Sequence, residues 1–262
     1  QKAIARVLST IQKAIEAQDK ILAAARELKK SLVRHLFTYG PVPVSEAERI
    51  PLKETEIGPM PEHWEVVRLG EITVKAKQVD PRREPNRTFQ YVDVSSISRE
   101  RLRIIESTSY TGEDAPLRAR KLVKSGDIIF ATVRPYLKRV AIIPNELDGN
   151  VISTAFCIIR SNDELAESNY LFYVVTKDDF VNRVSEHQRG SSYPAVTDKD
   201  ILTQLIPLPP ISKQQEIARM LSSVDNKIEA EENHKSALQA LFKTVLHHLM
   251  TGKVRMKELS PS

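Results

Sequence analysis

The chain has 262 residues, of which 41% are hydrophobic and 28% charged, fractions typical of soluble proteins with one or two domains. No apolar run reaches the roughly 18 residues of a transmembrane helix. The single cysteine, Cys157, excludes an internal disulfide and a cysteine-based metal site, so we expect a cytoplasmic protein with this thiol buried.

The net charge of +5 is unevenly distributed along the chain. Residues 75–140 contain 15 basic and 8 acidic side chains and are flanked by acidic segments. Such a block favours a polyanionic partner for one face of the protein. Chance clustering on a solvated surface is the alternative interpretation.

Residues 1–40 are predicted to form a first long helix. Its apolar side chains recur at alternating steps of three and four residues, which is the pattern of a coiled-coil seam. The helix should end at Gly40, because glycine followed by Pro41 is a common stop signal. Residues 41–62 contain five prolines among charged side chains and are predicted to be an extended surface linker.

Residues 41–210 as a whole are predicted to form one mixed α/β domain, large enough for its own core. A helix is expected from Asn169 to about Val184, with Ser168 as its cap. Trp64, the only tryptophan, is expected to anchor the core. Apolar and β-branched runs predict strands within residues 63–73, 89–97, 128–133, 139–143, 151–159 and 202–208, the third and fourth of which should pair as a hairpin.

Residues 211–262 are predicted to form a second long helix that repeats the first. Sliding the sequence by 213 positions aligns the two without a gap, with identical residues at 15 of 38 positions. Because one helix enters the middle domain and the other leaves it, we expect them to pack side by side in opposite directions. The predicted seam consists of Ile4, Leu8, Ile11, Ile15, Leu22, Leu32 and Leu36 from the first helix and Ile217, Leu221, Val224, Ile228, Leu238, Phe242, Val245 and Leu249 from the second.

The predicted fold class is therefore α+β, with one mixed α/β domain carried on an antiparallel pair of long helices. The predicted boundaries are residues 1–40, 41–210 and 211–262. Gln18 and Glu231 interrupt the seam with polar side chains, which fix register at a cost in stability. A surface helix packed on its own domain is the alternative. The whole resembles half of a pseudo-symmetric object, and we expect it to be part of a longer chain.

Sequence motifs of catalytic and metal sites are missing. The eight glycines are never closer than 12 positions apart, so no glycine-rich phosphate loop can form. No His-Glu-x-x-His or Cys/His cluster supports a metal, and Ser153 and Ser192 have no recognisable His/Asp setting. We expect a non-catalytic chain that binds no metal or cofactor of its own.

Loops rich in Arg, Lys, Ser and Tyr are the remaining functional candidates. Arginine and lysine neutralise phosphates, and arginine also reads guanine in the major groove. The residues expected to read bases are Arg134, Tyr136, Arg189, Ser192 and Tyr193. Those expected to contact phosphates are Lys75, Lys77, Lys121, Lys124, Lys138 and Arg139. The whole predicted DNA-binding set is Lys75, Lys77, Arg82, Arg83, Arg87, Arg118, Arg120, Lys121, Lys124, Arg134, Tyr136, Lys138, Arg139, Arg189, Ser191, Ser192 and Tyr193. For any one of them, a solvated surface residue is the alternative.

The chain resembles the specificity subunit of type I restriction–modification systems. The resemblance covers nearly the whole chain and rests on the repeated helix and on the segments GPMPEHWEVVRLGEI, GDIIFATVRPYLKRVAII and LIPLPPISKQQEIARMLSSVDNKI. In that family two target recognition domains alternate with two long helices, which pack antiparallel and act as a molecular ruler. Each recognition domain reads one half of a bipartite DNA site.

The resemblance implies several partners: double-stranded DNA, methyltransferase subunits and a restriction/translocase subunit, with no membrane. It also implies that S-adenosylmethionine and ATP bind only to those subunits. This chain departs from the pattern in lacking a first recognition domain, so we expect that domain, or a second copy of the chain, to complete the site. Two other hypotheses remain: a coiled-coil scaffold that binds only protein, and a half-length subunit that self-associates.

Overall fold

The computed structural model describes residues 2–251, which divide into two units. The residues up to Leu36 and those from Arg219 onward form the first unit, and Phe37–Ala218 form the second. Among the described helices, none combines the length and the apolar character needed to cross a membrane.

The chain contains five α-helices and fourteen strands within its described part. The helices are α1 (Lys2–Tyr39), α2 (Ser168–Val175), α3 (Asp178–Glu186), α4 (Asp198–Leu202) and α5 (Ile211–Met250). The strands are β1 (Leu52–Lys53), β2 (Met60–Pro61), β3 (Glu65–Arg68), β4 (Thr73–Val74), β5 (Thr88–Val92), β6 (Ile97–Ser98), β7 (Arg103–Ile104), β8 (Thr108–Thr111), β9 (Ala119–Leu122), β10 (Ile128–Ala131), β11 (Val140–Ile142), β12 (Val151–Ser153), β13 (Phe156–Ser161) and β14 (Leu205–Leu208).

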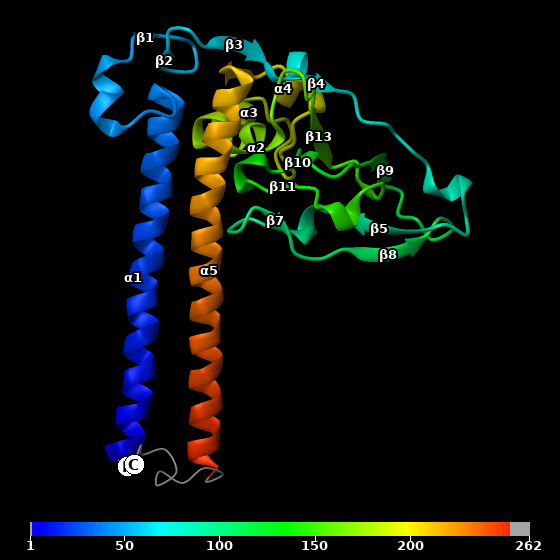
Figure 1. Cartoon of the computed structure of the whole chain (residues 1–262). Helices are drawn as coiled ribbons and strands as arrows, with labels where there is room; N and C mark the ends of the chain where they lie inside the picture. The colour runs from blue at the N-terminus through cyan, green and yellow to red at the C-terminus, as the bar shows by residue number, and fades with distance from the viewer. Residues whose placement is uncertain (1, 252–262) are drawn as a thin grey trace. The chain divides into compact units, whose positions relative to one another are not determined.

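The first unit consists of α1 up to Leu36 and of α5 from Arg219 onward, and the two helices run side by side in opposite directions (Figure 1). Three ion pairs join them along their length: Asp19–Lys235 at 2.5 Å, Arg26–Glu232 at 2.7 Å and Lys29–Asp225 at 2.6 Å. As residue numbers rise along α1, those of the partner residues on α5 fall, as an antiparallel pair requires. The mixed domain and the long helices together match the predicted α+β class.

The predicted seam residues are the shielded residues of this pair. Except for Ile4, which lies outside the described side chains, each of them is buried or half-buried. Ile15, Leu22 and Leu221 are buried. By contrast, Ile21 and Leu28 on α1 are exposed, so the helix has one covered and one open apolar face.

Gln18 and Glu231 meet at the middle of the helix pair. The Gln18 amide donates to the Glu231 carbonyl oxygen at 3.1 Å and also to its carboxylate. These two residues occupy equivalent positions in the sequence repeat, 213 residues apart. A residue can contact its own equivalent only near the two-fold axis that relates the copies, so the helix pair has its local axis here.

The second unit is built from layered sheets. One four-stranded antiparallel sheet has the order β11-β10-β13-β4, and another has the order β8-β5-β12-β9, in which β12 runs parallel to β5 and antiparallel to β9. Between them lies an apolar core that includes Ile129, Ile152, Phe156 and Ile158. On its opposite face the first sheet packs against α3, where the rings of Phe130 and Phe180 meet edge to face with centroids 6.1 Å apart. Cys157 and Trp64 are buried, as predicted.

Four predicted elements are each divided in the structure. The run of residues 63–73 forms β3 and the start of β4, and that of residues 89–97 forms β5 and the start of β6; in both cases a 3-10 turn separates two strands of different sheets. The run of residues 151–159 forms β12 and β13, which belong to different sheets, and the chain turns between them at Thr154-Ala155. The predicted helix of residues 169–184 is α2 and α3. The break lies at Lys177, whose backbone is extended with φ of −63° and ψ of 144°, whereas the backbone N–H and the hydroxyl of Thr176 still donate to the Phe172 carbonyl oxygen.

Three other details differ from the prediction. Glu167, not Ser168, caps α2, because its carboxylate accepts the backbone N–H of Tyr170 at 2.5 Å. The expected linker of residues 41–62 contains a short antiparallel hairpin of β1 and β2, in which Met60 is buried. The expected strand of residues 202–208 is shorter, because α4 occupies the chain up to Leu202.

Candidate nucleic-acid interface

The connection after β10 and the loop after α3 meet at one end of the second unit. The backbone N–H of Arg134 donates to the carbonyl oxygen of Pro194 at 2.8 Å, and Val133 forms an antiparallel bridge with Ala195. Ala195 also exchanges two backbone hydrogen bonds with Arg189, at 2.9 and 3.0 Å. Two loops that lie far apart in sequence are thereby tied into one short ribbon.

This ribbon carries six exposed side chains that were predicted to contact DNA. All six are exposed, and Tyr136 and Tyr193 are 50% and 73% accessible. The set contains two arginines, two tyrosines and two serines, which together can contact phosphates, base edges and sugars. We call these residues the tip cluster: Arg134, Tyr136, Arg189, Ser191, Ser192 and Tyr193.

The turn that presents Arg134 has a constrained backbone. Arg134 and Lys138 both have φ of 50°, in the left-handed region that non-glycine residues seldom adopt. Between them, Pro135–Leu137 form a 3-10 turn. Backbone strain of this kind is frequent at functional sites, where the surrounding structure holds it.

The guanidinium of Arg134 lies 5.4 Å from the centroid of the Tyr193 ring, a distance suited to a cation–π contact. It also makes a weak contact of 3.5 Å with the Ser192 carbonyl oxygen. No carboxylate pairs with it among the described residues, so its charge remains available to an anion.

Arg189 is held differently. Its Nη1 donates to Asp200 Oδ2 at 2.7 Å and its Nη2 to Asp200 Oδ1 at 3.3 Å. The hydrogen bond from Arg189 is the largest cause that holds the pKa of the Asp200 carboxyl well below its usual range, and the backbone N–H of Thr197 adds to it. The sequence analysis did not identify Asp200, although Thr197-x-x-Asp200 is a recognisable capping box for α4.

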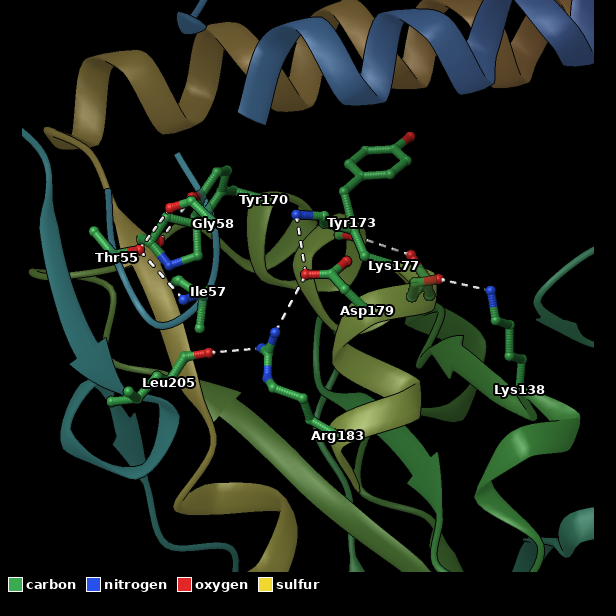
Figure 2. A network of polar contacts seen from close by, with 12 residues as sticks. Thr55, Ile57, Gly58, Lys138, Tyr170, Tyr173, Lys177, Asp179, Arg183 and Leu205 are labelled. Atoms are coloured by element: carbon green, nitrogen blue, oxygen red, sulfur yellow. Dashed lines mark hydrogen bonds and ion pairs between the residues drawn. The ribbon is translucent and has the colours of Figure 1, made fainter. Parts of the chain in front are cut away.

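Four cations of the predicted DNA-binding set have internal partners instead. Lys138 pairs with Asp178 (Figure 2), and Arg120 pairs with Asp80 at 2.5 Å. Arg139 Nη1 points at three backbone carbonyls, those of Val94, Ser95 and Ile97, at 2.7, 3.3 and 2.9 Å. The structure thus gives these residues, and Lys121, a role in joining segments of the domain.

Lys121 is the plainest correction. It is buried, and its Nζ donates to the Phe156 carbonyl oxygen and to Asp198 Oδ2, both at 2.6 Å. Two of its three N–H donors are thus used inside the domain, and the buried ammonium is directed away from a phosphate on the surface.

Replacing Lys121 with methionine is therefore expected to lower the free energy of unfolding by about 1–3 kcal/mol, because a buried carbonyl loses its donor. The salt dependence of DNA affinity should stay unchanged. The exposed Lys75 provides the matched control: Lys75→Met should leave stability unchanged. Denaturant unfolding measures the stability, and DNA titrations at several salt concentrations measure the salt dependence. A flatter salt dependence of DNA affinity in the Lys121 variant would show that Lys121 contacts a phosphate after all.

The remaining predicted cations fall into three places. Arg118 is connected to the end of β10 that leads to Arg134. Its carbonyl oxygen accepts the backbone N–H of Thr154, and the carbonyl oxygen of Ala155, the residue after Thr154, accepts the backbone N–H of Thr132. Lys124 precedes β10 and so lies at the opposite end of that strand from Arg134. The segment that contains Lys75 and Lys77 lies along the edge of the second sheet beside β9, where the Leu122 backbone N–H donates to the Lys77 carbonyl oxygen. The loop after this segment contains Arg82, Arg83 and Arg87.

Two of these loop residues also have partners. Arg82 donates to the Ala115 carbonyl oxygen at 3.0 Å, and Arg87 pairs with Glu84 at 3.2 Å on the open surface. The backbone of this loop packs directly against Gly112, and only glycine fits there because a Cβ would lie 2.1 Å from the Glu84 carbonyl oxygen. Within the described chain, no group of three or more His, Cys, Asp or Glu side chains is arranged to hold a metal ion.

Comparison with known proteins places the chain among DNA-specificity proteins. Residues 61–240 match the family model of the type I restriction modification DNA specificity domain. The MjaVIII specificity subunit of a type I restriction enzyme from Methanocaldococcus jannaschii is 29% identical over 99% of this chain and 61% of its own length. The putative MjaX specificity subunit from the same organism is 30% identical over 98% of this chain and 58% of its own length. The chain thus spans about three fifths of these curated relatives.

Solved structures are similar over a comparable range. The HsdS subunit from Thermoanaerobacter tengcongensis is 41% identical, with a TM-score of 0.61 over 69% of this chain and 46% of that one. A chain from a study of complex assembly and conformational transition of the type I R-M system is 40% identical, with a TM-score of 0.60 over 77% of this chain and 50% of that one. The S subunit from M. genitalium, at 17% identity and a TM-score of 0.54 over 93% of this chain and 59% of that one, shares the fold.

Proposed function

This chain belongs to the family of type I restriction–modification DNA specificity domains, and from that premise we propose that its second unit reads one half-site of duplex DNA. The observation that carries the proposal is the tip cluster. Two arginines and two exposed tyrosines, brought together from loops more than 50 residues apart, protrude from a ribbon with a constrained backbone. Such a group combines phosphate attraction with base-edge donors.

We further propose that the helix pair docks methyltransferase subunits and spaces half-sites. Leu28 on α1 and Leu241 on α5 are equivalent positions of the repeat, and both are exposed, at 61% and 48%. The two helices thus present the same apolar side chain on their open surfaces, as expected for a partner-binding face. With 38 residues, α1 is about 57 Å long, a length that suits a spacer between two recognition domains.

In this proposal the chain performs no catalysis and binds no cofactor. S-adenosylmethionine, ATP and the reactions that use them belong to the methyltransferase and restriction subunits. The competing function is a scaffold that binds only proteins, and the exposed Leu28 and Leu241 would serve it equally well. DNA selection separates the two functions.

The test is selection from a pool of random duplexes with the whole chain, alone and with a methyltransferase subunit. Enrichment of one short motif is the expected result. Two motifs at a fixed spacing would show that two copies of the chain assemble into a complete specificity subunit. No enrichment under either condition, together with tight methyltransferase binding, would support the scaffold.

Replacing Arg134 with alanine should weaken binding to the selected motif by about 1–3 kcal/mol and relax the preference at one base position. The reason is that its guanidinium is exposed and is paired with none of the carboxylates that the structure describes. Anisotropy titrations with the selected duplex and with each single-base variant measure both effects.

Arg83→Ala is the matched control, since Arg83 is an exposed arginine in the 3-10 turn Pro81–Arg83. If it contacts a phosphate, its loss should weaken binding to all sequences equally and reduce the salt dependence by about one ion. An Arg134 variant with unchanged affinity and unchanged base preference would remove that residue from the interface.

A further inference from the structure

Arg189 and Asp200 form a two-point contact at the surface of the tip cluster. The side chain of Arg189 is 66% exposed, whereas that of Asp200 is only 12% exposed. The carboxylate therefore lies on the inner side of the pair and the guanidinium on the outer side. Hydrogen bonds from both terminal nitrogens to the two carboxylate oxygens fix the position and the orientation of the guanidinium.

Asp200 is itself immobilised by its own helix end. Its Oδ2 accepts from the backbone N–H and from the hydroxyl of Thr197, at 2.8 and 2.7 Å. The Thr197 hydroxyl in turn accepts from the backbone N–H of Asp200 at 3.2 Å. Because this capping box is anchored in α4, Arg189 is held against the folded domain although it belongs to a loop.

The contact leaves one edge of the guanidinium free. Only the two terminal nitrogens of Arg189 meet Asp200, so its Nε–H and the outward N–H of a terminal nitrogen stay available side by side. Two parallel donors of this kind match the O6 and N7 acceptors of guanine in the major groove. A phosphate gains less from this arginine, because the Asp200 charge cancels that of the guanidinium.

We propose that Asp200 is a positioning residue, which orients Arg189 so that its free edge reads a guanine in the major groove. The assignment rests on the proposed DNA-reading function and adds to it a base, a reader and the residue that directs the reader. It also gives the two arginines of the tip cluster different roles. Arg134 keeps its full charge and attracts DNA, whereas Arg189 contributes sequence preference but little net electrostatic attraction to DNA.

The test uses the whole chain with a methyltransferase subunit, random-duplex selection and titrations at several salt concentrations. In Asp200→Asn and in Arg189→Lys, the preference for guanine at one position should fall about 10- to 100-fold, as expected for the loss of one two-point contact. The affinity of Asp200→Asn for unrelated duplexes should rise and its salt dependence steepen by about one ion, because the Arg189 charge is no longer cancelled. Arg189→Lys keeps the charge and removes only the planar fork.

Asp179→Asn is the matched control. Asp179 also accepts from an arginine, Arg183, at 3.3 Å, but Arg183 turns its other end inward to the Leu205 carbonyl oxygen at 2.9 Å (Figure 2). This variant has the same change of charge and should keep the guanine preference.

The outcomes distinguish this assignment from the proposed function. A wild-type chain without any base preference would overturn both. A wild-type preference that Arg189→Lys retains would overturn the assignment of Arg189 alone. If Asp200→Asn lowers affinity for all duplexes equally and keeps the guanine preference, Asp200 only supports the fold and its positioning role is wrong. If the Asp200 variant does not fold, Arg189→Lys alone tests whether Arg189 reads the guanine.

Discussion

Replacing Asp127 with alanine is expected to lower the free energy of unfolding of the second unit by about 3–5 kcal/mol. Asp127 is 2% exposed, and its carboxylate accepts from Arg160 Nε at 2.7 Å and Nη2 at 2.6 Å. It also accepts the backbone N–H of Lys124 at 2.8 Å. The substitution leaves a largely buried guanidinium without its counter-charge, which costs more than the pair itself contributes. Denaturant unfolding followed by the fluorescence of Trp64, the single tryptophan and a buried one, measures the effect.

Asp163→Ala is the control for that experiment. Asp163 is exposed, and among the described residues its carboxylate accepts from the Ser161 hydroxyl alone, at 3.0 Å. Its removal should change stability by about 0.5 kcal/mol or less. Equal losses in the two variants would mean that the Asp127–Arg160 pair contributes no more than an ordinary surface contact.

The long helices were predictable because their signals are local. The apolar period recurs along each helix, and Gly40, which has φ of +83°, ends α1 where the Gly-Pro signal indicated. The break between α2 and α3 was missed for a related reason. The apolar spacing continues across Thr176 and Lys177, so periodicity cannot reveal that the backbone leaves the helix there. The acidic pair Asp178-Asp179, in the first turn of α3, was the available signal.

The division of residues 151–159 had no local signal. Both halves of the run are buried, so the apolar pattern is the same whether the segment is one strand or two. The pairing of β12 with β5 and of β13 with β10 decides the outcome, and those contacts join residues far apart in sequence. Non-local pairing of this kind cannot be read from one segment.

The candidate site was predictable in residue type and less so in orientation. Sequence patterns favoured Arg134 and Tyr193 as exposed loop residues, and the structure places them in contact. The same reasoning assigned Arg139 to phosphates, yet its guanidinium turns inward to backbone carbonyls. The sequence reveals the charge of a side chain, whereas its partner depends on which segments the fold brings within reach.

The helix pair provides the second large effect: Leu22→Ala should lower the stability of the first unit by about 2–5 kcal/mol. Leu22 is 4% exposed and belongs to the seam between α1 and α5. Alanine favours helix formation, so the loss reports on packing between the helices and not on helix propensity. Differential scanning calorimetry, which can resolve the transitions of the two units, is the measurement.

Leu28→Ala is the same substitution on the open face of the same helix. Leu28 is 61% exposed, so its truncation should change stability by about 0.5 kcal/mol or less. If the open face docks a methyltransferase subunit, this variant, combined with Leu241→Ala at the equivalent position, should instead weaken that binding by more than about 1 kcal/mol. The two leucines would then separate the roles of the two faces: one holds the helices to each other, and the other holds the partner. Equal destabilisation by Leu22→Ala and Leu28→Ala would contradict the seam, and unchanged methyltransferase binding in the Leu28/Leu241 double variant would contradict the docking face.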